Sequence, residues 1–162
     1  MSTNTRTTRG GKYLTFALSR EEYGLEILKV REIIGIMDIT VVPRVPSHVK
    51  GVINLRGQVI SVIDLRSKFA MPEVDRTEET CIIVVETTGV DGRKRSTGLI
   101  VDKVSEVLSI TDENIEDAPS FGSSVDTQFI LGMGKIGAAV KILLNIDKVL
   151  GADDEVPLEA AA

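Results

Sequence analysis

The fold is decided by the stretch Val49-Lys-Gly-Val-Ile-Asn-Leu-Arg-Gly-Gln-Val-Ile-Ser-Val-Ile-Asp-Leu-Arg-Ser-Lys-Phe69. Two apolar, β-branched runs, Gly51–Ile53 and Val59–Ile63, flank a short connection that ends at Gly57. Such runs around a short loop ending in glycine are typical of a β-hairpin. Polar turn residues would suffice at its tip, yet the tip carries a leucine and an arginine. We therefore expect the tip to contact a partner.

Short apolar and β-branched segments continue on both sides of this hairpin. We expect strands at Tyr13–Leu18, Tyr23–Ile27, Ile36–Pro43, Cys81–Glu86, Thr97–Val101, Val104–Ile110, Phe129–Met133 and Val140–Leu144. Several short strands at this spacing favour small β-barrels over a parallel α/β sheet. The unbroken Ile/Val run after Cys81 predicts a strand buried on both faces. Helices are expected to be short, with Asp64 as an N-cap.

An internal repeat indicates two similar β subdomains. Tyr23–Ile34 aligns without gaps on Thr97–Leu108, and the identical pairs are Gly24/Gly98, Leu25/Leu99, Lys29/Lys103, Val30/Val104 and Glu32/Glu106. Val62–Phe69 then matches Leu143–Leu150 in the same order, which places Asp64 and Asn145 at equivalent cap positions. The period of roughly 75 to 80 residues is too long for a solenoid repeat.

The length, composition and charge of the 162-residue chain limit its possible domain organisation and partners. We expect a disordered tail at 1–11, an ordered domain at 12–151 that divides near residue 78, and an acidic tail at 152–162. The net charge of −5 argues against non-specific binding to nucleic acid or to an anionic membrane. No run approaches the roughly 18 to 20 apolar residues that insertion into a membrane needs, and no signal peptide is visible, which predicts a cytoplasmic protein.

Residues for catalysis, metal binding or cofactor binding are scarce. One cysteine, Cys81, and one histidine, His48, are too few for a zinc site. Gly132-Met-Gly-Lys-Ile-Gly137 matches a dinucleotide-binding pattern, but too few residues follow it for a second βαβ unit. We interpret it as a turn between the last two strands. No enzymatic activity, cofactor or metal is expected, and a small nucleotide-binding protein remains an alternative.

Four blocks of sequence together resemble the CheW family of chemotaxis coupling proteins. These blocks are Tyr13–Leu18, Glu21–Ile34, Val49–Gly57 and Val62–Arg66. The resemblance continues in Gly98–Val104 and runs from about Lys12 to Gly151. Two departures are visible, since Ser61 stands where the family often has proline and the loop with Arg93-Lys-Arg95 is longer than expected.

The resemblance implies an all-β fold of two intertwined, five-stranded SH3-like barrels with short helices, and a non-catalytic adaptor. Such proteins couple the cytoplasmic tips of methyl-accepting chemoreceptors to the regulatory domain of the histidine kinase CheA, in arrays at the inner face of the membrane. The receptor's helical tip is expected in an apolar groove between the barrels. The alternative is the coupling domain of a CheV-type protein, for which 162 residues leave no room for a receiver domain.

The resemblance also implies two sets of contact residues. On the receptor side we expect Val30, Glu32, Ile53, Leu55, Arg56 and Gly57. On the kinase side we expect Ile39, Val41 and Arg44. Core packing is the alternative for Val30 and Ile53, and a local ion pair with Lys29 or Arg31 is the alternative for Glu32.

Overall fold

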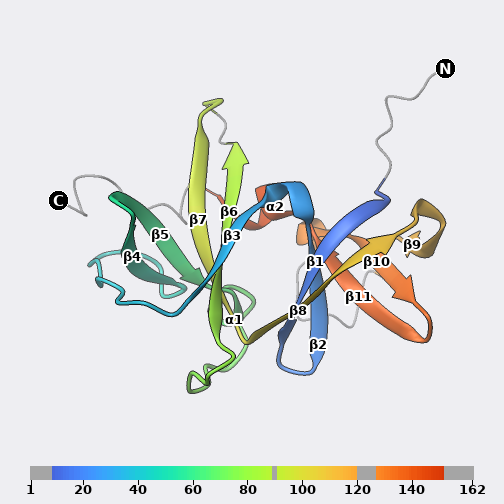
Figure 1. Cartoon of the computed structure of the whole chain (residues 1–162), viewed down its shortest axis with the longest axis horizontal. Helices are drawn as coiled ribbons and strands as arrows, with labels where there is room; N and C mark the ends of the chain where they lie inside the picture. Colours follow the sequence, from blue (N-terminus) through green and yellow to red (C-terminus); the bar gives the residue numbers. More distant parts are fainter. Residues whose placement is uncertain (1–8, 89–90, 120–126, 152–162) are drawn as a thin grey trace.

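The computed structural model describes residues 9–88, 91–119 and 127–151, which form two β-sheets side by side (Figure 1). The first sheet has the spatial order β8-β1-β2-β11-β10-β9, and the second has the order β3-β6-β7-β5-β4. The first contains β1 (Gly11–Leu18), β2 (Glu21–Glu26), β8 (Lys103–Ile110), β9 (Ile115–Glu116), β10 (Ile130–Ile136) and β11 (Ala139–Leu144). The second contains β3 (Val30–Gly35), β4 (Val49–Leu55), β5 (Gln58–Asp64), β6 (Cys81–Thr88) and β7 (Lys94–Val101). The predicted all-β class with two subdomains is confirmed, although the first sheet has six strands where five were expected.

The helices are short, as predicted, and two of them begin at equivalent caps. They are α1 (Leu65–Lys68), α2 (Ile146–Val149) and the 3-10 turns η1 (Ile27–Lys29), η2 (Asp112–Asn114) and η3 (Thr127–Phe129). An Asp64 carboxylate oxygen accepts a hydrogen bond from the Arg66 amide at 2.9 Å. The Asn145 side chain accepts one from the Lys148 amide at 3.3 Å. The cap pair predicted from the repeat is therefore confirmed.

Each sheet combines strands from both sequence repeats. The first sheet takes β1 and β2 from the first repeat and β8 to β11 from the second. The second sheet takes β6 and β7 from the second repeat and β3 to β5 from the first. A boundary near residue 78 thus separates the two repeats but not the two sheets. Each subdomain is therefore built from strands of both halves of the chain, and not from one half alone.

The glycines shared by the two repeats lie at equivalent parallel strand pairs. Gly24 on β2 is opposite Leu143 on β11, and Gly98 on β7 is opposite Val62 on β5. A Cβ at Gly24 would lie 2.8 Å from a Leu143 methyl carbon, and a Cβ at Gly98 would lie 2.7 Å from an Ile82 methyl carbon. Close packing at these two positions explains why both repeats carry glycine there.

The second sheet curls, because the chain that leaves one of its edges pairs with the other edge. Strand β3 ends at Gly35, and Thr40 then exchanges two backbone hydrogen bonds with Val52 on β4, at 2.8 and 2.9 Å. Gly51 permits this approach, because its φ is +143° and a Cβ there would lie 2.0 Å from the Thr40 carbonyl oxygen. The predicted strand at Ile36–Pro43 is wrong, since within it only Thr40 pairs.

The glycine-rich segment near the C-terminus is also not the predicted turn. Gly132 and Gly134 lie within β10, and only Gly137, with a φ of +57°, belongs to the turn before β11. A Cβ at Gly132 would lie 2.5 Å from an Ile115 methyl carbon. These two glycines therefore let neighbouring strands approach β10, and they offer no phosphate-binding loop.

Residues 9–11 belong to the folded part, although they were predicted to lie in the N-terminal tail. Strand β1 already pairs with β8 at Gly11. The Arg9 guanidinium donates a hydrogen bond to Asp117 at 2.8 Å, and others to the carbonyls of Ile115 and Leu131 at 3.3 Å. The rest of the predicted tail, 1–8, and the predicted tail 152–162 lie outside the described residues.

A core shared by both sheets holds the two subdomains together. Its largest cluster includes Leu14 and Leu25 from the first sheet and Ile83 and Leu99 from the second. Phe16, Tyr23, Phe69 and Phe129 extend it as a row of rings with successive centroids 5.8, 6.1 and 6.3 Å apart. Within β6, Ile82–Val85 are all buried, which confirms the prediction for this strand. Burial of one apolar cluster by two sheets fixes their relative position.

Candidate docking surface

The β4–β5 hairpin ends in a two-residue turn that holds Arg56 in an uncommon backbone conformation. Leu55 pairs with Gln58, and the turn residues Arg56 and Gly57 have φ values of 52° and 90°. The Gly57 amide donates a hydrogen bond to the Asn54 side chain at 2.7 Å. Positive φ at both central residues is what a type I′ turn requires, and such turns usually carry Asn-Gly. An arginine here is locally unfavourable for folding, which points to a role in binding.

Arg56 forms an ion pair with Glu32 on β3. The hydrogen bond to Glu32 raises the pKa of Arg56. The Arg56 side chain is 68% exposed and the Glu32 side chain 30% exposed. The pair therefore orients Arg56 while most of its side chain, with its remaining donors, stays accessible to solvent. The alternative partners of Glu32 are engaged elsewhere, because Lys29 pairs with Asp147 at 2.7 Å and Arg31 with Glu86 at 3.6 Å.

The remaining expected receptor residues differ in exposure. Leu55 is half-buried and packs on the cluster that contains Ile53 and Ile60. Ile53 itself is only 2% exposed, so its side chain lies in the core and is not available to a partner. Val30 is half-buried against the shared core, and Gly57 is exposed. For Ile53, the structure thus matches the core-packing alternative.

A small hollow brings three of the expected receptor residues together. It has a volume of about 190 Å³ and is lined by Arg31, Glu32, Leu55, Arg56, Gln58, Ile60, Val84 and Ser96. The fold therefore places Glu32, Leu55 and Arg56 around one concavity although they come from opposite edges of the sheet. We call these three residues, with Val30 and Gly57, the tip surface.

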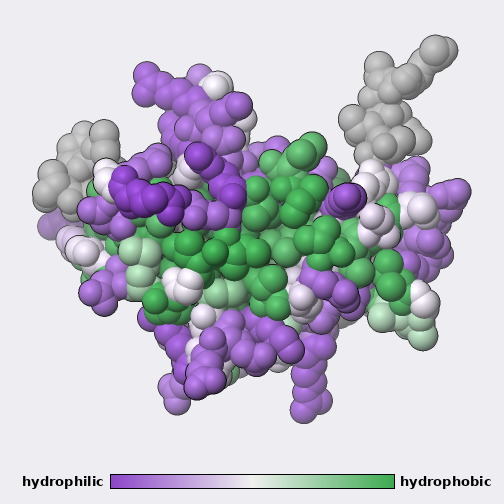
Figure 2. Space-filling view, viewed as in Figure 1, coloured by the Kyte–Doolittle hydropathy of each residue, from purple (hydrophilic) through white to green (hydrophobic). Residues whose placement is uncertain are grey.

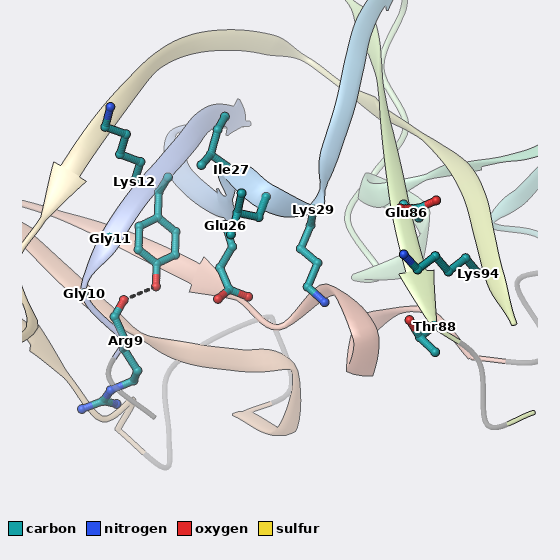
Figure 3. A pocket seen from close by; sticks show the side chains of 12 residues that line it. Arg9, Gly10, Gly11, Lys12, Glu26, Ile27, Lys29, Glu86, Thr88 and Lys94 are labelled. Carbon is teal, nitrogen blue, oxygen red and sulfur yellow. Dashed lines mark hydrogen bonds between the residues drawn. The ribbon is translucent and has the colours of Figure 1, made fainter. Parts of the chain in front are cut away.

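A larger cleft of about 560 Å³ lies between the two sheets (Figure 3). Its walls are Arg9–Tyr13 and Glu26 from the first sheet's side, Ile27–Lys29 from η1, and Glu86, Thr88 and Lys94 from β6 and β7. The η1 residues that line the cleft directly precede Val30, so the cleft adjoins the tip surface along the chain. Its lining is more charged than the apolar groove expected from the resemblance.

Apolar side chains gather in a band across the middle of one face (Figure 2). The band lies over the region where β3 and β8 run between the two halves in Figure 1. On these strands Ile33 is 45% exposed and Val107 is 50% exposed. Leu28, in η1, is 94% exposed. Exposed apolar residues that gather on one face are typical of protein-docking surfaces.

The residues expected on the kinase side lie in the extended segment between β3 and β4. Val41 is 79% exposed, and Arg44 is exposed with a φ of 63°. Ile39 is half-buried and packs on the same apolar cluster as Leu55. Both expected docking faces therefore rest on one cluster in the second sheet.

The described part of the chain offers little reactive chemistry. Within it, no group of three or more His, Cys, Asp or Glu side chains is placed to hold a metal ion. Burial raises the pKa of the Cys81 thiol, which lowers the fraction present as reactive thiolate. No helix in the described ranges has the length and apolar character needed to cross a bilayer.

Fold and site together define a two-sheet β protein with exposed apolar and charged side chains on its surface. The family model for the CheW-like domain matches residues 12–154, and the chain belongs to this family. It is 42% identical over 147 residues to the chemotaxis protein CheW of Klebsiella aerogenes, covering 91% of this chain and 86% of that protein. It is 36% identical over 137 residues to CheW of Bacillus subtilis, covering 85% and 83% respectively. The crystal structure of the scaffolding protein TtCheW from Thermoanaerobacter tengcongensis has a TM-score of 0.78 at 34% identity, covering 91% of this chain and 97% of that one.

Membership of this family sets the function class. The chain is a non-catalytic chemotaxis coupling adaptor, as the sequence resemblance predicted. The family interacts with chemotaxis receptors and with the kinase CheA. The CheV-type alternative is weaker, since the relatives of higher identity are named CheW.

Proposed function

We propose that the tip surface binds the cytoplasmic helical tip of a chemoreceptor. The observation that carries this proposal is the ion pair between Arg56 and Glu32, which presents an exposed arginine from a turn where arginine is unfavourable. A planar guanidinium with free donors suits a receptor carboxylate or the carbonyl groups at a helix end. Leu55 adds an apolar contact beside it, and arginine is enriched at interface hot spots.

The receptor helix is proposed to continue from this surface into the cleft between the sheets. The cleft adjoins Val30, and the highly exposed Leu28 lies in its wall. A receptor helix that contacts Arg56 and Leu55 at one end can thus contact η1 further along. This is the helix-in-groove mode, in which apolar residues on one helix face carry much of the affinity.

The kinase CheA is proposed to dock on the extended segment with Ile39, Val41 and Arg44. Val41 is 79% exposed and lies next to Val42, which is 4% exposed, so this segment presents alternate side chains to core and solvent. The segment and the tip surface lie at different places on the second sheet and share only the underlying cluster. Both partners can then bind at once, which a coupling adaptor in a receptor array at the membrane requires.

Co-purification with each partner and with both tests this proposal. The purified chain is mixed with a receptor cytoplasmic fragment, with the CheA regulatory domain, and with the two together. We expect two binary complexes and one ternary complex by size-exclusion chromatography. Val41→Asp should weaken the kinase complex and spare the receptor complex. Mutually exclusive binding, or an equal loss of both complexes in this variant, would contradict two separate faces.

A further inference from the structure

One wall of the inter-sheet cleft is formed by the β6–β7 hairpin, which contributes none of the five residues of the tip surface. This hairpin projects beyond the rest of the second sheet at the top of Figure 1. Glu86 and Thr88 on β6 and Lys94 on β7 line the cleft. Figure 3 shows the Lys94 amine on this wall and the Lys29 amine on the η1 side, both directed into the space between them.

The cations of the cleft are not equally neutralised. Lys29 pairs with Asp147 at 2.7 Å, and Arg9 pairs with Asp117 at 2.8 Å. Within residues 9–88, 91–119 and 127–151, no ion pair is formed by Lys94. The nearby acid Glu86 is bound by Arg31 at 3.6 Å, and the other lining acid, Glu26, lies on the opposite wall. In the described part of the chain, Lys94 and Lys12 are thus the lining cations without an ion pair. Figure 3 shows the Lys12 amine directed away from the space between Lys29 and Lys94, which leaves Lys94 as the unpaired cation that faces this space.

Leu28 supplies an apolar contact in the same cleft. Its side chain is 94% exposed and contributes to none of the core clusters formed by the described residues. In the sequence repeat its counterpart is Asp102, which is bound by Arg66 at 2.6 and 2.8 Å. The chain passes between the two sheets through η1, before β3, and again at Asp102, before β8. At Asp102 the side chain is held in an ion pair, whereas at the equivalent place in η1 Leu28 is exposed to solvent.

We propose that the β6–β7 hairpin is a second recognition element, which selects an acidic amphipathic helix through Lys94. The helix places an apolar side chain against Leu28 and a carboxylate against the Lys94 amine. This rests on the proposed docking of a receptor helix along the cleft, and it adds the chemical character of that helix. A charge at the rim of an interface acts mainly on partner choice, association rate and salt dependence.

The test compares two charge reversals on the same hairpin. Lys94→Glu changes the cation that lines the cleft, and Arg93→Glu changes its exposed neighbour, which does not line the cleft. Affinity for a receptor cytoplasmic fragment is measured by calorimetry at low and high salt, after circular dichroism has shown unchanged folding. We expect Lys94→Glu to weaken binding about five- to tenfold at low salt and less at high salt. Arg93→Glu should stay within about twofold.

Further arms separate the possible outcomes. A receptor fragment with one carboxylate changed to lysine should regain affinity for Lys94→Glu, which would support a direct contact. Equal affinities of the two hairpin variants would overturn the inference alone, with receptor docking intact. No receptor binding by the wild type would overturn the proposed function and this inference together. Binding to phosphatidylglycerol vesicles that Lys94→Glu abolishes, with receptor affinity unchanged, would assign Lys94 to a lipid surface and overturn the inference.

Discussion

Arg56 and Glu32 join the two edges of the second sheet. Glu32 lies on β3 and Arg56 at the turn after β4, and these strands are the first and last in the spatial order β3-β6-β7-β5-β4. The Thr40–Val52 bridge joins the same two edges further along. The curl of the sheet thus brings Glu32 close enough to orient the exposed Arg56. The geometry of the tip surface therefore depends on the fold of the second sheet.

Glu32→Gln should separate the binding role of this ion pair from its role in stability. Exposed ion pairs contribute little to folding, so we expect the urea midpoint to remain almost unchanged. Receptor affinity should fall, because Arg56 loses the carboxylate that orients it. Calorimetry and urea unfolding on the same preparation check both expectations. A shifted midpoint with unaltered affinity would instead assign the pair to folding.

Gly51→Ala should destabilise the second sheet strongly. A Cβ there would lie 2.0 Å from the Thr40 carbonyl oxygen, at a φ of +143°. We expect a loss of more than about 2 kcal/mol in the free energy of unfolding. Gly35→Ala is the matched control, since no atom lies within 4 Å of its added Cβ. Similar urea midpoints for the two variants would contradict the close approach of Thr40 and Gly51.

Asp102 should make stability fall in acid. Its burial alone would raise the carboxyl pKa, but hydrogen bonds from Arg66 and the Ser19 amide outweigh burial and lower it. A lowered folded-state pKa adds stability above the unfolded value of about 3.9, and this stability is lost as the pH falls through the folded pKa. Asp102→Asn should therefore be less stable near pH 7 and should show a flatter loss below about pH 4. Parallel pH curves for wild type and variant would contradict this.

Asp64→Asn should have the opposite pH signature. Burial raises the pKa of this carboxyl despite its hydrogen bond from the Arg66 amide. A raised folded-state pKa means that ionisation opposes folding at neutral pH and that this cost disappears in acid. Asparagine keeps the cap and removes the charge, as at the equivalent Asn145. Thermal unfolding should show Asp64→Asn at least as stable as wild type at pH 7. A marked loss there would mean that the charge itself stabilises α1.

The sequence predicted the strands, the caps and the repeat because these depend on local patterns. Alternating or continuous β-branched runs identified the β4–β5 hairpin and the buried β6, and Asp64 and Asn145 marked the helix starts. The resemblance implied intertwined subdomains, but the local patterns could not show that β1 and β2 join strands of the second repeat and β6 and β7 join strands of the first. Either sheet offers the same spacing and pairing chemistry to an incoming strand. The false strand at Ile36–Pro43 shows the same limit, because β-branched composition does not guarantee a neighbour to pair with.

The candidate site was only partly predictable. The unusual Leu55-Arg56 tip could be noticed from composition, whereas its partner Glu32 could not be assigned, because the contact requires the sheet to curl. Ile53 was expected at the surface and is buried. Leu28 and Lys94 were missed, although the alignment of Leu28 with Asp102 in the repeat was a usable signal, since one crossover carries an apolar residue where the other carries an acid.

The most direct test of receptor docking on the tip surface is the receptor affinity of Arg56→Ala. Lys135→Ala is the control, since Lys135 is a cation on the equivalent β10–β11 hairpin of the first sheet and pairs with Glu116 on β9. Titration calorimetry with a receptor cytoplasmic fragment should show a loss of about thirtyfold for Arg56→Ala, the size typical of an interface hot spot. Lys135→Ala should bind like wild type. Wild-type affinity in a correctly folded Arg56→Ala protein would contradict the account.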